Sequence, residues 1–359
     1  MKKITWCAVA RAPYLDYLHT ELNKHFDLKV FYKLKKRTHP WELDKVAYNH
    51  SNIDGHLFEA IRSSMNSNLL MVSGWAFWQH LIIMLIPMKS TKKIYWTDTP
   101  NLDRKEWTGV RGYIRRAIVK IVFNVFDEVW STGTPGCEAL EKLGCKKEKI
   151  QSFTFFFDLS RYLNKDPEKL SKAAAFKAKN TNADTEIIFL SAGQVIPKKR
   201  FENAIEAISR LNNEKAILWI AGTGPVEGEL KAYAKKLNVT KQVKFLGWLQ
   251  QDEVELAFMT SDVFVHPSHF DPFPIVVLDA MTWGKPIIAT QESGSAKDRV
   301  VHGKSGFLYP TGNVDRLTEH LKFFVENREE IKNFGLEARK TACTYPVEWA
   351  IDKFKSLTN

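Results

Sequence analysis

Short apolar runs alternate with helical patterns along almost the whole chain, and this alternation constrains the fold more than any other feature. The runs expected to be strands in the first half are residues 4–9, 28–32, 69–72, 93–96 and 128–131. In the second half they are residues 187–191, 216–221, 243–246, 263–266 and 286–289. Helical patterns separate the strands, for example at 14–24, 111–126, 201–211 and 227–237. Such alternation favours parallel sheets with helices on both faces.

The chain has 359 residues, more than one hydrophobic core usually serves. We therefore predict the α/β class, with two tandem Rossmann-like, doubly wound domains and a ligand cleft between their strand ends. Residues 164–184 contain few large apolar side chains, and we interpret them as a linker. The predicted parts are an N-terminal domain at 1–164, a C-terminal domain at 165–340, and a last helix at 341–359 that packs back on the N-terminal domain.

Residues 69–88 need a separate interpretation, because they carry no formal charge and approach the roughly 20 residues that a bilayer span requires. Ser73-Gly74 and Gln79-His80 interrupt the stretch, and Pro87 ends it. We interpret it as a buried strand, a turn and a helix at 77–86. The four cysteines lack metal-ligand spacing and a disulfide framework, and no secretory signal is visible, so we expect a cytoplasmic protein.

The net charge of +11 is unevenly distributed, with +10 on residues 1–165 and +1 on residues 166–359. A basic first half suggests an anionic partner, either a phospholipid surface, a lipid-pyrophosphate acceptor or nucleic acid. Arg111, Arg115 and Lys120 are interpreted as sharing part of one helical face, which predicts peripheral contact with anionic lipid. The other basic residues assigned to this contact are Lys33, Lys35, Lys36, Arg37, Arg104, Lys105 and Arg116. A merely solvated, solubilising face is the alternative.

The most informative segment is Pro-Ser-His-Phe-Asp-Pro-Phe-Pro-Ile-Val-Val-Leu-Asp-Ala-Met at 267–281, which leaves a strand and enters an apolar helix. Asp271 lies in the loop, and Asp279 lies about two turns along the helix. A helix N-terminus offers free N–H groups and partial positive charge, which suit a sugar diphosphate. Carboxylates beside it can accept hydrogen bonds from sugar hydroxyls. The alternative is that both aspartates are loop and helix-cap residues.

Together with Trp-Gly-Lys-Pro-Ile-Ile-Ala-Thr at 283–290, this segment resembles the donor-site signature of retaining glycosyltransferase family 4. That signature contains Pro-Ser, Glu-Pro-Phe-Gly, Glu-Ala-Met and Gly-x-Pro. Residues 293–295 and 302–308 are similar to the family's Gly-rich loop and Asp-Gly-x-Gly-Phe turn. The resemblance implies the two-domain B-type fold. It also implies transfer of a sugar from a nucleotide-diphosphate sugar to a glycan or lipid-linked acceptor, in cell-surface polysaccharide or lipopolysaccharide synthesis.

By this resemblance, Asp271 would contact the donor sugar and Asp279 the ribose hydroxyls, while the backbone N–H groups of Phe273 and Ile275 face the sugar or phosphate. Two departures from the family matter. Both family glutamates are aspartates here, so the hydroxyls must lie closer or be bridged by water. The family's Gly is Pro274, which lacks the N–H that could face the donor.

Residues 191–200 are similar to the family's diphosphate-gripping loop, in which an Arg follows the Gly and a Lys comes five residues later. Gly193 and Lys199 match this pattern, but Gln194 replaces the Arg and cannot give its bidentate charged contact. Either Arg200 replaces the missing arginine, or Lys199 as one strong cation binds the diphosphate together with helix N-termini. A solvated basic turn is the alternative.

Two further donor-site stretches follow in the same half. Gly222 and Gly224 resemble the Gly-x-Gly bend under the nucleotide, although two such glycines alone are a weak signal and most are plain turns. Gly247, Trp248 and Leu249 match the stretch whose backbone usually reads the base.

The first half resembles the family more loosely. Arg11 and Tyr14 follow the first strand and are predicted to contact the acceptor or a phosphate, with a core position as the alternative for Tyr14. Asp98 stands where many members place a His near the reacting sugar, and a helix cap is its alternative role. The predicted catalytic residues are therefore Asp98, Lys199 and Asp271.

The leading function is a hexosyl or N-acetylhexosaminyl transfer without a metal or other cofactor, because no Asp-x-Asp motif is present and cationic groups can stabilise the departing diphosphate. A catalytically weak or inactive sugar-nucleotide-binding homologue is the alternative, based on the departures above. Nucleic-acid binding rests on charge alone. A dinucleotide dehydrogenase is disfavoured, because Arg-Ala-Pro follows the first strand in place of a Gly-x-Gly-x-x-Gly turn. The sequence does not determine which nucleotide base or which sugar the donor carries.

Overall fold

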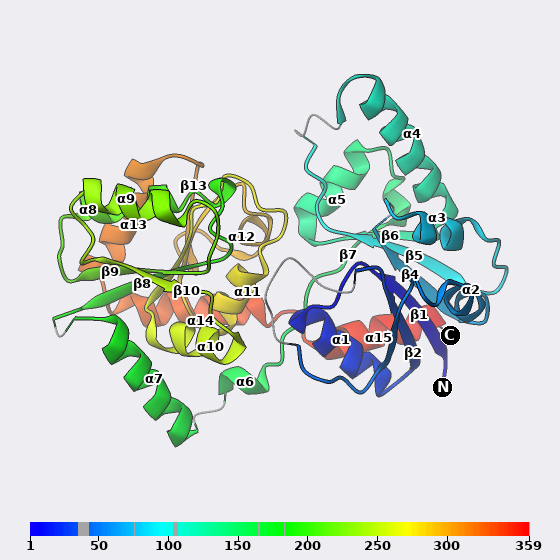
Figure 1. The fold of residues 1–359 in the computed structure, drawn as a ribbon, viewed down its shortest axis with the longest axis horizontal. Coiled ribbons are helices and arrows are strands. Elements are labelled where there is room, and N and C mark those ends of the chain that lie inside the picture. The colour runs from blue at the N-terminus through cyan, green and yellow to red at the C-terminus, as the bar shows by residue number, and fades with distance from the viewer. Residues whose placement is uncertain (35–42, 75, 103–106, 164–165, 183, 359) are drawn as a thin grey trace. The chain divides into compact units, whose positions relative to one another are not determined.

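The computed structural model describes residues 1–34, 43–74, 76–102, 107–163, 166–182 and 184–358. The chain forms two compact units. Unit 1 contains Met1–Phe157 and Tyr345–Asn359, and unit 2 contains Asp158–Thr344. Each unit is a parallel sheet with helices on both faces, so the predicted α/β class with two doubly wound halves is confirmed (Figure 1). Of the residues assigned to lipid contact, Lys35, Lys36, Arg37, Arg104 and Lys105 lie outside the described residues.

Unit 1 has a seven-stranded parallel sheet in the order β3-β2-β1-β4-β5-β6-β7. Its strands are β1 (Lys3–Ala8), β2 (Asp27–Tyr32), β3 (Asn49–Asn52), β4 (Leu69–Ser73), β5 (Lys92–Thr97), β6 (Glu128–Ser131) and β7 (Ile150–Ser152). The strand order reverses direction between β1 and β4. In doubly wound sheets, ligands bind outside the carboxyl ends of the strands at such a reversal.

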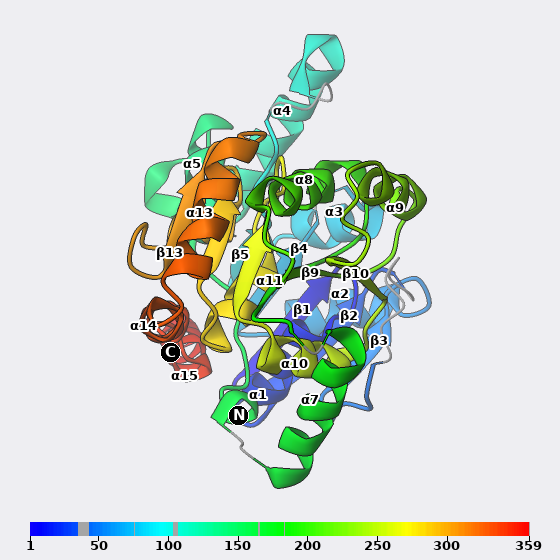
Figure 2. The ribbon, with the colours of Figure 1, turned by 90° about the vertical axis from the view of Figure 1, so that its left-hand side faces the viewer.

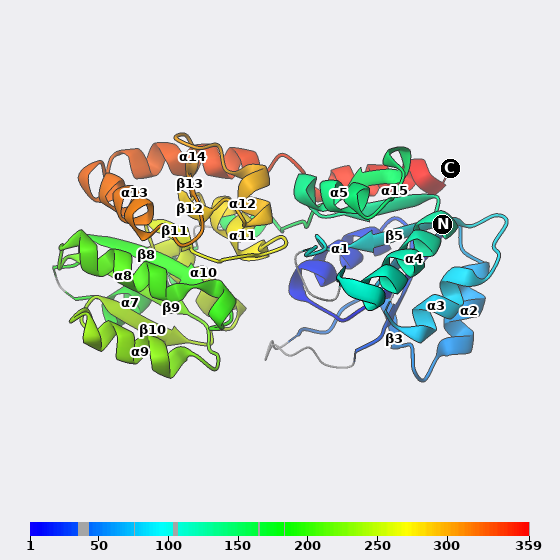
Figure 3. The same ribbon diagram turned by 90° about the horizontal axis from the view of Figure 1, so that it is seen from above.

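Helices cover both faces of this sheet (Figure 3). On one face lie α2 (Leu57–Met65), α3 (Trp78–Leu85), α4 (Gly109–Val125) and α5 (Gly133–Lys142), which share a core with Cys7 and Val129. On the other lie α1 (Pro13–Asn23) and α15 (Val347–Thr358). Trp6 and Trp130, the strand neighbours of Cys7 and Val129, contact Phe354 of α15. Because side chains alternate across a strand, α15 covers the face opposite α2–α5.

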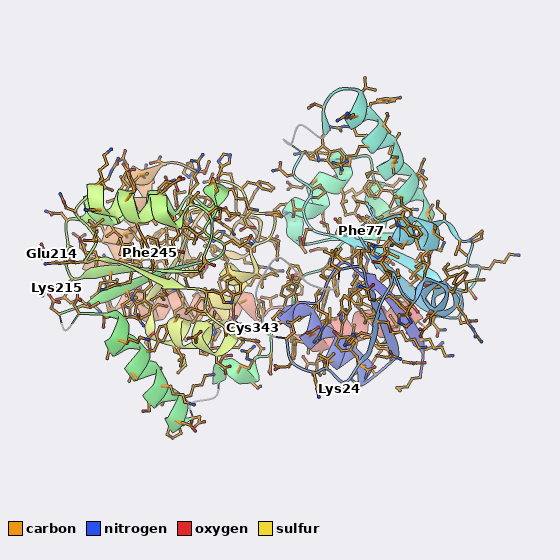
Figure 4. The ribbon with its side chains drawn as sticks, viewed as in Figure 1. Lys24, Phe77, Glu214, Lys215, Phe245 and Cys343 are labelled. Carbon is orange, nitrogen blue, oxygen red and sulfur yellow. The ribbon has the colours of Figure 1, made fainter. Side chains whose placement is uncertain are left out.

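Unit 2 has a six-stranded parallel sheet in the order β10-β9-β8-β11-β12-β13, with its reversal between β8 and β11. The strands are β8 (Ile187–Ala192), β9 (Ala216–Ala221), β10 (Val243–Gly247), β11 (Val263–His266), β12 (Ile287–Thr290) and β13 (Gly306–Tyr309). Phe245 of β10, labelled in Figure 4, is partly buried and packs against the hydrophobic core of this unit.

Two layers of helices enclose the unit 2 sheet (Figure 2). One layer contains α8 (Phe201–Leu211), α9 (Glu227–Lys236) and α13 (Val314–Glu326), which share a core with Val263 and Val265. In the other layer, α10 (Gln251–Thr260) packs Phe258 on Phe264, the residue between those valines. Here α7 (Pro167–Asn180) lies on α10, and α14 (Glu330–Ala342) lies on α11 (Ile275–Thr282). The short helices are α6 (Ser160–Leu163) and α12 (Gly294–Arg299).

The segment expected to be a linker instead contains α7, so that prediction is wrong. Asp166 caps this helix by accepting a hydrogen bond of 3.0 Å from the backbone N–H of Glu168. Ala and Lys favour helix strongly, and a helix that buries little more than Ala173 needs few large apolar residues. Lys169 of α7 pairs with Glu255 of α10. The low apolar content of this segment is therefore explained by a helix that lies on the outside of unit 2.

The uncharged stretch at 69–88 folds as predicted, with a strand (β4) followed by a helix (α3). Within the described ranges, no helix combines the length and the apolar character that crossing a bilayer demands.

Candidate functional site

Lys199 and Asp271 come from two strands that meet at the reversal of the unit 2 sheet. Lys199 ends a short 3-10 turn, Pro197–Lys199, after β8, and Asp271 lies in the loop after β11. The two strands pair directly, and buried Ser191 of β8 donates a hydrogen bond of 2.8 Å to the carbonyl of Val265 in β11. Since parallel strands end at the same edge, both loops emerge together, where ligands bind in this class of fold.

Backbone hydrogen bonds fasten the two loops to each other. The carbonyl of Lys198 accepts from the His269 N–H at 2.8 Å and from the Ser268 hydroxyl at 3.1 Å. Thr290, at the end of β12, donates its hydroxyl to the carbonyl of Ser268 at 2.7 Å. The turn that carries Lys199 is therefore held against the loop that carries Asp271.

The Lys199 ammonium forms an ion pair with Oδ2 of Asp271. Both side chains are largely buried, at 13% and 11% exposed. Nε2 of His266 lies 3.2 Å from the same oxygen, and His266 is fully buried. Three side chains thus form one buried cluster, which we call the Lys199–Asp271–His266 cluster.

The charges of this cluster follow from burial and contact. Burial alone would raise the pKa of Asp271, but the hydrogen bond to His266 and the charge of Lys199 outweigh it and hold that pKa well below its usual range. Burial lowers the pKa of His266 despite the adjacent carboxylate, so the imidazole is neutral at pH 7. A neutral imidazole next to a carboxylate must donate its N–H, so His266 orients Asp271 as a hydrogen-bond donor.

This arrangement can bind an anion and a hydroxyl group side by side. An ammonium has three donors, so Lys199 can keep Asp271 and still contact phosphate oxygens. Asp271 stays ionised at neutral pH and can accept from a sugar hydroxyl. His266 was not predicted as a site residue, because a single His at the end of Val-Phe-Val-His looks like any strand residue.

The predicted glycines sit where backbones come unusually close. Gly222 has a φ of +133°, and a Cβ there would overlap the carbonyl oxygen of Gly193. A Cβ at Gly224 would likewise overlap the carbonyl of Val195. The Gly222 N–H donates to the carbonyl of Gly247 at 2.7 Å. The loops after β8, β9 and β10 therefore pack backbone against backbone, beside the Lys199 side chain, which lies over Gly193.

Asp279 belongs to a second cluster. It is half-buried on α11 and accepts a hydrogen bond of 2.8 Å from the Tyr162 hydroxyl. The Tyr162 ring packs edge-on against Trp283 at 4.9 Å. Burial raises the pKa of Asp279 to about 6, although the hydrogen bond from Tyr162 acts in the opposite direction. Tyr162 is a contact that sequence reasoning missed, because it lies far from Asp279 in the chain.

The N-terminus of α11 separates the two aspartates. Ile275 is the first residue of the helix, so its N–H has no acceptor within it. Ser295 donates its hydroxyl to the carbonyl of Pro274 at 2.8 Å, and the Gly294 N–H donates to the carbonyl of Asp271 at 2.9 Å. Phe273 is buried beneath this turn. The helix end is thereby held beside the Lys199–Asp271–His266 cluster.

Other predicted donor residues take different positions. Arg200 is half-exposed and pairs with Glu202 at 3.2 Å, so the structure places its guanidinium in a surface ion pair. Gln194 is half-buried directly after Gly193, Trp248 is half-buried, and Leu249 is buried.

The predicted residues of unit 1 lie at the carboxyl ends of its strands. Arg11, after β1, forms a bidentate pair with Asp16 at 2.7 and 3.3 Å and donates to the carbonyl of Asp44 at 2.8 Å. Tyr14 is half-buried and packs edge-on against Phe155 at 4.9 Å. Asp98 is exposed directly after β5.

Among the residues that the structure describes, no group of three or more His, Cys, Asp and Glu side chains could hold a metal ion. Two open hollows of about 470 and 730 Å³ on unit 2 are lined by residues such as Asn212 and Thr311, and neither includes Lys199, Asp271 or Asp279.

The second half of the chain is similar to known proteins. Residues 172–341 match the family model for glycosyl transferases group 1. The lipopolysaccharide core biosynthesis glycosyltransferase LpsE of Rhizobium meliloti is 32% identical over 183 residues, which cover 51% of this chain and 49% of that protein. The chain spans about half the length of the curated relatives it matches.

Solved structures show the same fold across both units. Anabaena Alr3699/HepE in complex with UDP has a TM-score of 0.76 at 16% identity, covering 99% of each chain. The lipopolysaccharide outer core galactosyltransferase WaaB in its apo form has a TM-score of 0.72 at 15% identity, covering 99% of this chain and 98% of that chain. The predicted B-type glycosyltransferase fold is therefore confirmed, while membership of family 4 stays a prediction.

Proposed function

We propose that this protein is a retaining glycosyltransferase that moves a hexosyl or N-acetylhexosaminyl group from a UDP-sugar to a glycan or lipid-linked acceptor. One observation carries the proposal: Lys199, Asp271 and His266 form a buried cluster at the strand reversal of the unit that matches group 1 glycosyl transferases. The UDP in complex with Alr3699/HepE and the core biosynthesis role in the name of LpsE support the donor and the acceptor class.

In this proposal, unit 2 stabilises the departing nucleoside diphosphate. The C1–O bond of the donor breaks with its electron pair on the phosphate oxygen, and the acceptor hydroxyl oxygen bonds to C1 on the same face. The hydroxyl proton leaves with the diphosphate. The Lys199 ammonium and the N-terminus of α11 offset the developing negative charge. Asp271 accepts a hydrogen bond from the donor sugar, and Asp279 accepts from the ribose hydroxyls.

We assign the positive charge to protein groups, and therefore propose that no metal ion is required. Activity retained in excess EDTA would support this assignment, and activity restored by Mg²⁺ or Mn²⁺ after chelation would overturn it. Retention is tested by proton NMR of the first product formed, since the coupling constant at C1 reports the anomer.

The experiment that tests the function uses purified protein. A thermal-shift screen with UDP, GDP, ADP and their sugars identifies the donor, because a ligand that binds the native state stabilises it by about 2.7 kcal/mol at a hundred times its Kd. Release of the nucleoside diphosphate is then measured with and without lipopolysaccharide-type acceptors.

Variants connect this activity to the cluster. Lys199→Met and Asp271→Asn should each reduce kcat/KM by about a hundredfold or more, because each removes a group that acts on the transition state. Lys322→Met and Asp315→Asn, exposed elsewhere on unit 2, are the matched controls. Equal activity of all four variants and wild type would remove the cluster from the mechanism. Donor binding without any turnover would favour the alternative, an inactive sugar-nucleotide-binding homologue.

Unit 1 is assigned to the acceptor, through Arg11, Tyr14 and Asp98. Asp98→Ala should reduce turnover by about tenfold or more if the carboxylate contacts a reacting hydroxyl. Unchanged turnover would end that role. We also propose a cytoplasmic location, with peripheral contact at the inner face of the cell membrane.

A further inference from the structure

Helix α4 is apolar on two opposite faces. Val119, Val122 and Phe123 are buried in the core of unit 1. On the outside, five large apolar side chains follow the i, i+3, i+4, i+8, i+11 spacing of one helical face and are 37–77% exposed: Val110, Tyr113, Ile114, Ile118 and Ile121. Since an α-helix turns by about 100° per residue, these five share one stripe, opposite the core face. A surface helix of a globular domain has only one apolar face, so the outer stripe calls for a partner.

Helix α3, next to α4, also has exposed apolar side chains. It contacts α4, and the two helices lie side by side (Figures 1 and 3). Trp78, Ile82 and Leu85 of α3 are exposed, with Trp78 at 59% and Leu85 at 60%. Within the described part of the chain, α3 and α4 together supply half of the large apolar side chains that are exposed. We call these eight residues the α3–α4 apolar surface. Exposed apolar side chains gathered in this way mark an interaction site.

All charged side chains of α3 and α4 are positive, and all of them belong to α4. The helix contains Arg111, Arg115, Arg116 and Lys120 and no carboxylate, and α3 contains no charged residue. The helical rotation puts Arg111 and Lys120 on opposite sides of the outer stripe, so the prediction that Arg111, Arg115 and Lys120 share one face is wrong. The guanidinium groups of Arg115 and Arg116 lie 5.4 and 6.0 Å from the ring of buried Trp107. The cations therefore border an apolar stripe on both sides.

We propose that the α3–α4 apolar surface docks on an anionic lipid bilayer, with α4 lying in the plane of the membrane. The outer stripe enters the boundary between headgroups and acyl chains, and Arg111 and Lys120 contact headgroup phosphates. This inference sharpens the peripheral membrane contact of the proposed function and concerns unit 1 alone.

The composition of the surface separates a bilayer from other partners. A nucleic acid would use the cations but leave the aliphatic stripe against phosphate and water. A second copy docked through the same surface would bring the four cations of one α4 close to those of the other. A bilayer with acidic headgroups satisfies the apolar stripe and the bordering cations together.

Vesicle flotation with purified protein tests the proposal, using phosphatidylcholine vesicles with and without phosphatidylglycerol and no nucleotide-sugar. We expect wild type to float with the anionic vesicles and to be released by high salt, because screening weakens the cation contacts. The triple variant Ile114→Ser/Ile118→Ser/Ile121→Ser should lose about tenfold or more of the partition coefficient, through lost apolar burial. Arg111→Gln/Lys120→Gln should lose the preference for anionic vesicles.

Matched controls come from unit 2. Leu336→Ser removes an apolar side chain that is 57% exposed, and Lys322→Gln removes an exposed cation, so both should float like wild type. Because the three isoleucines are exposed, the triple variant should keep its far-UV circular dichroism and thermal unfolding.

Three outcomes would overturn the proposal: equal flotation with neutral and anionic vesicles, unchanged flotation of the triple variant, or a wild-type dimer in sedimentation velocity that the triple variant dissociates. No donor takes part, so these results are independent of sugar transfer.

Discussion

Asp271 is the residue whose surroundings most determine what unit 2 can do. Its Oδ2 contacts both the Lys199 ammonium and Nε2 of His266. Lys199 contributes charge, and buried His266 contributes a neutral hydrogen-bond donor. An aspartate is one methylene shorter than the glutamate of the family pattern and has one rotatable bond fewer, so these two contacts leave its carboxylate little freedom to turn. We infer that His266 is a positioning residue for Asp271.

Replacing His266 tests that role. His266→Phe removes the donor and leaves a buried carboxylate with one partner fewer, so we expect a loss of about 1–3 kcal/mol in the free energy of unfolding and a kcat/KM at least about tenfold lower. His266→Gln keeps a hydrogen-bond donor, so it should recover part of the free energy of unfolding and part of kcat/KM. Denaturant unfolding and initial rates measure the two effects.

The control is His320→Phe, since that ring stacks on Phe307 at 4.5 Å and makes no contact with Asp271 among the described residues. Should the Gln and Phe variants show the same kcat/KM, the hydrogen bond to Asp271 would have no part in catalysis.

Asp279 predicts a pH dependence of stability with a defined sign. Its pKa is raised from 3.8 to about 6 by burial, so the native state binds more protons than the unfolded chain between those values. The contribution of Asp279 to the free energy of unfolding therefore falls as the pH rises through the window from about 4 to 6 and is level above it. Asp279→Asn has no ionisable group at this position, so it lacks this pH-dependent contribution.

We thus expect wild type to lose stability relative to Asp279→Asn over that window, as measured by denaturant unfolding at a series of pH values. Tyr162→Phe removes the hydrogen bond that favours the charged form, so it should move the window to higher pH. A stability difference that is constant from pH 4 to 7 would contradict this assignment.

The sequence singled out candidate site residues only where a motif marks them. Lys199 and Asp271 were selected by resemblance to a family pattern, and the structure joins them in an ion pair. His266 and Tyr162 had no such signal, since their roles depend on which side chain lies opposite. Arg200 was a candidate by proximity in the sequence, but it pairs with Glu202.

At the scale of elements, the loops after β8 and β9 are packed too closely for any side chain between them. Gly222→Ala should therefore be strongly destabilising, because its Cβ would overlap the Gly193 carbonyl and its φ of +133° disfavours alanine. We expect a loss of about 3 kcal/mol or more in the free energy of unfolding, with weaker donor stabilisation in thermal shift.

Gly228→Ala is the control. It lies in α9, and a Cβ there meets nothing within 4 Å. Helix propensity then predicts a gain of up to about 1 kcal/mol. Equal effects of the two substitutions would show that the close approach of the loops is unimportant.

Strong periodic patterns made most elements predictable, such as β9 and α8, whose observed bounds equal the predicted ones. The failures have physical causes. β3 reads Asn-His-Ser-Asn and is held at the sheet edge by pairing with β2, so no apolar alternation marks it. α7 was mistaken for a linker because most of its surface faces solvent.

On the scale of the whole molecule, the last segment of the chain belongs with the first. Phe354 of α15 is fully buried, and its ring centroid lies about 6 Å from those of Trp6, Trp130 and Phe153. Unit 1 is thus completed by residues 345–359, which follow the whole of unit 2 in the sequence. Among the described residues, the buried cluster beneath α2–α5 belongs to unit 1 and the buried cluster beneath α8, α9 and α13 belongs to unit 2.

This division predicts that the two units can be destabilised separately. Phe354→Ala removes a large ring from the core of unit 1, which typically lowers stability by about 3–5 kcal/mol. Hydrogen exchange measured by mass spectrometry should then show faster opening of β1 and β6, while β8 and β9 keep their protection. Phe258→Ala, which empties a fully buried position in unit 2, should give the reverse pattern. Because the donor is assigned to unit 2, UDP should slow exchange in β8 and β9 of the Phe354→Ala variant as in wild type. Loss of protection in both units from either substitution would mean that they unfold as one.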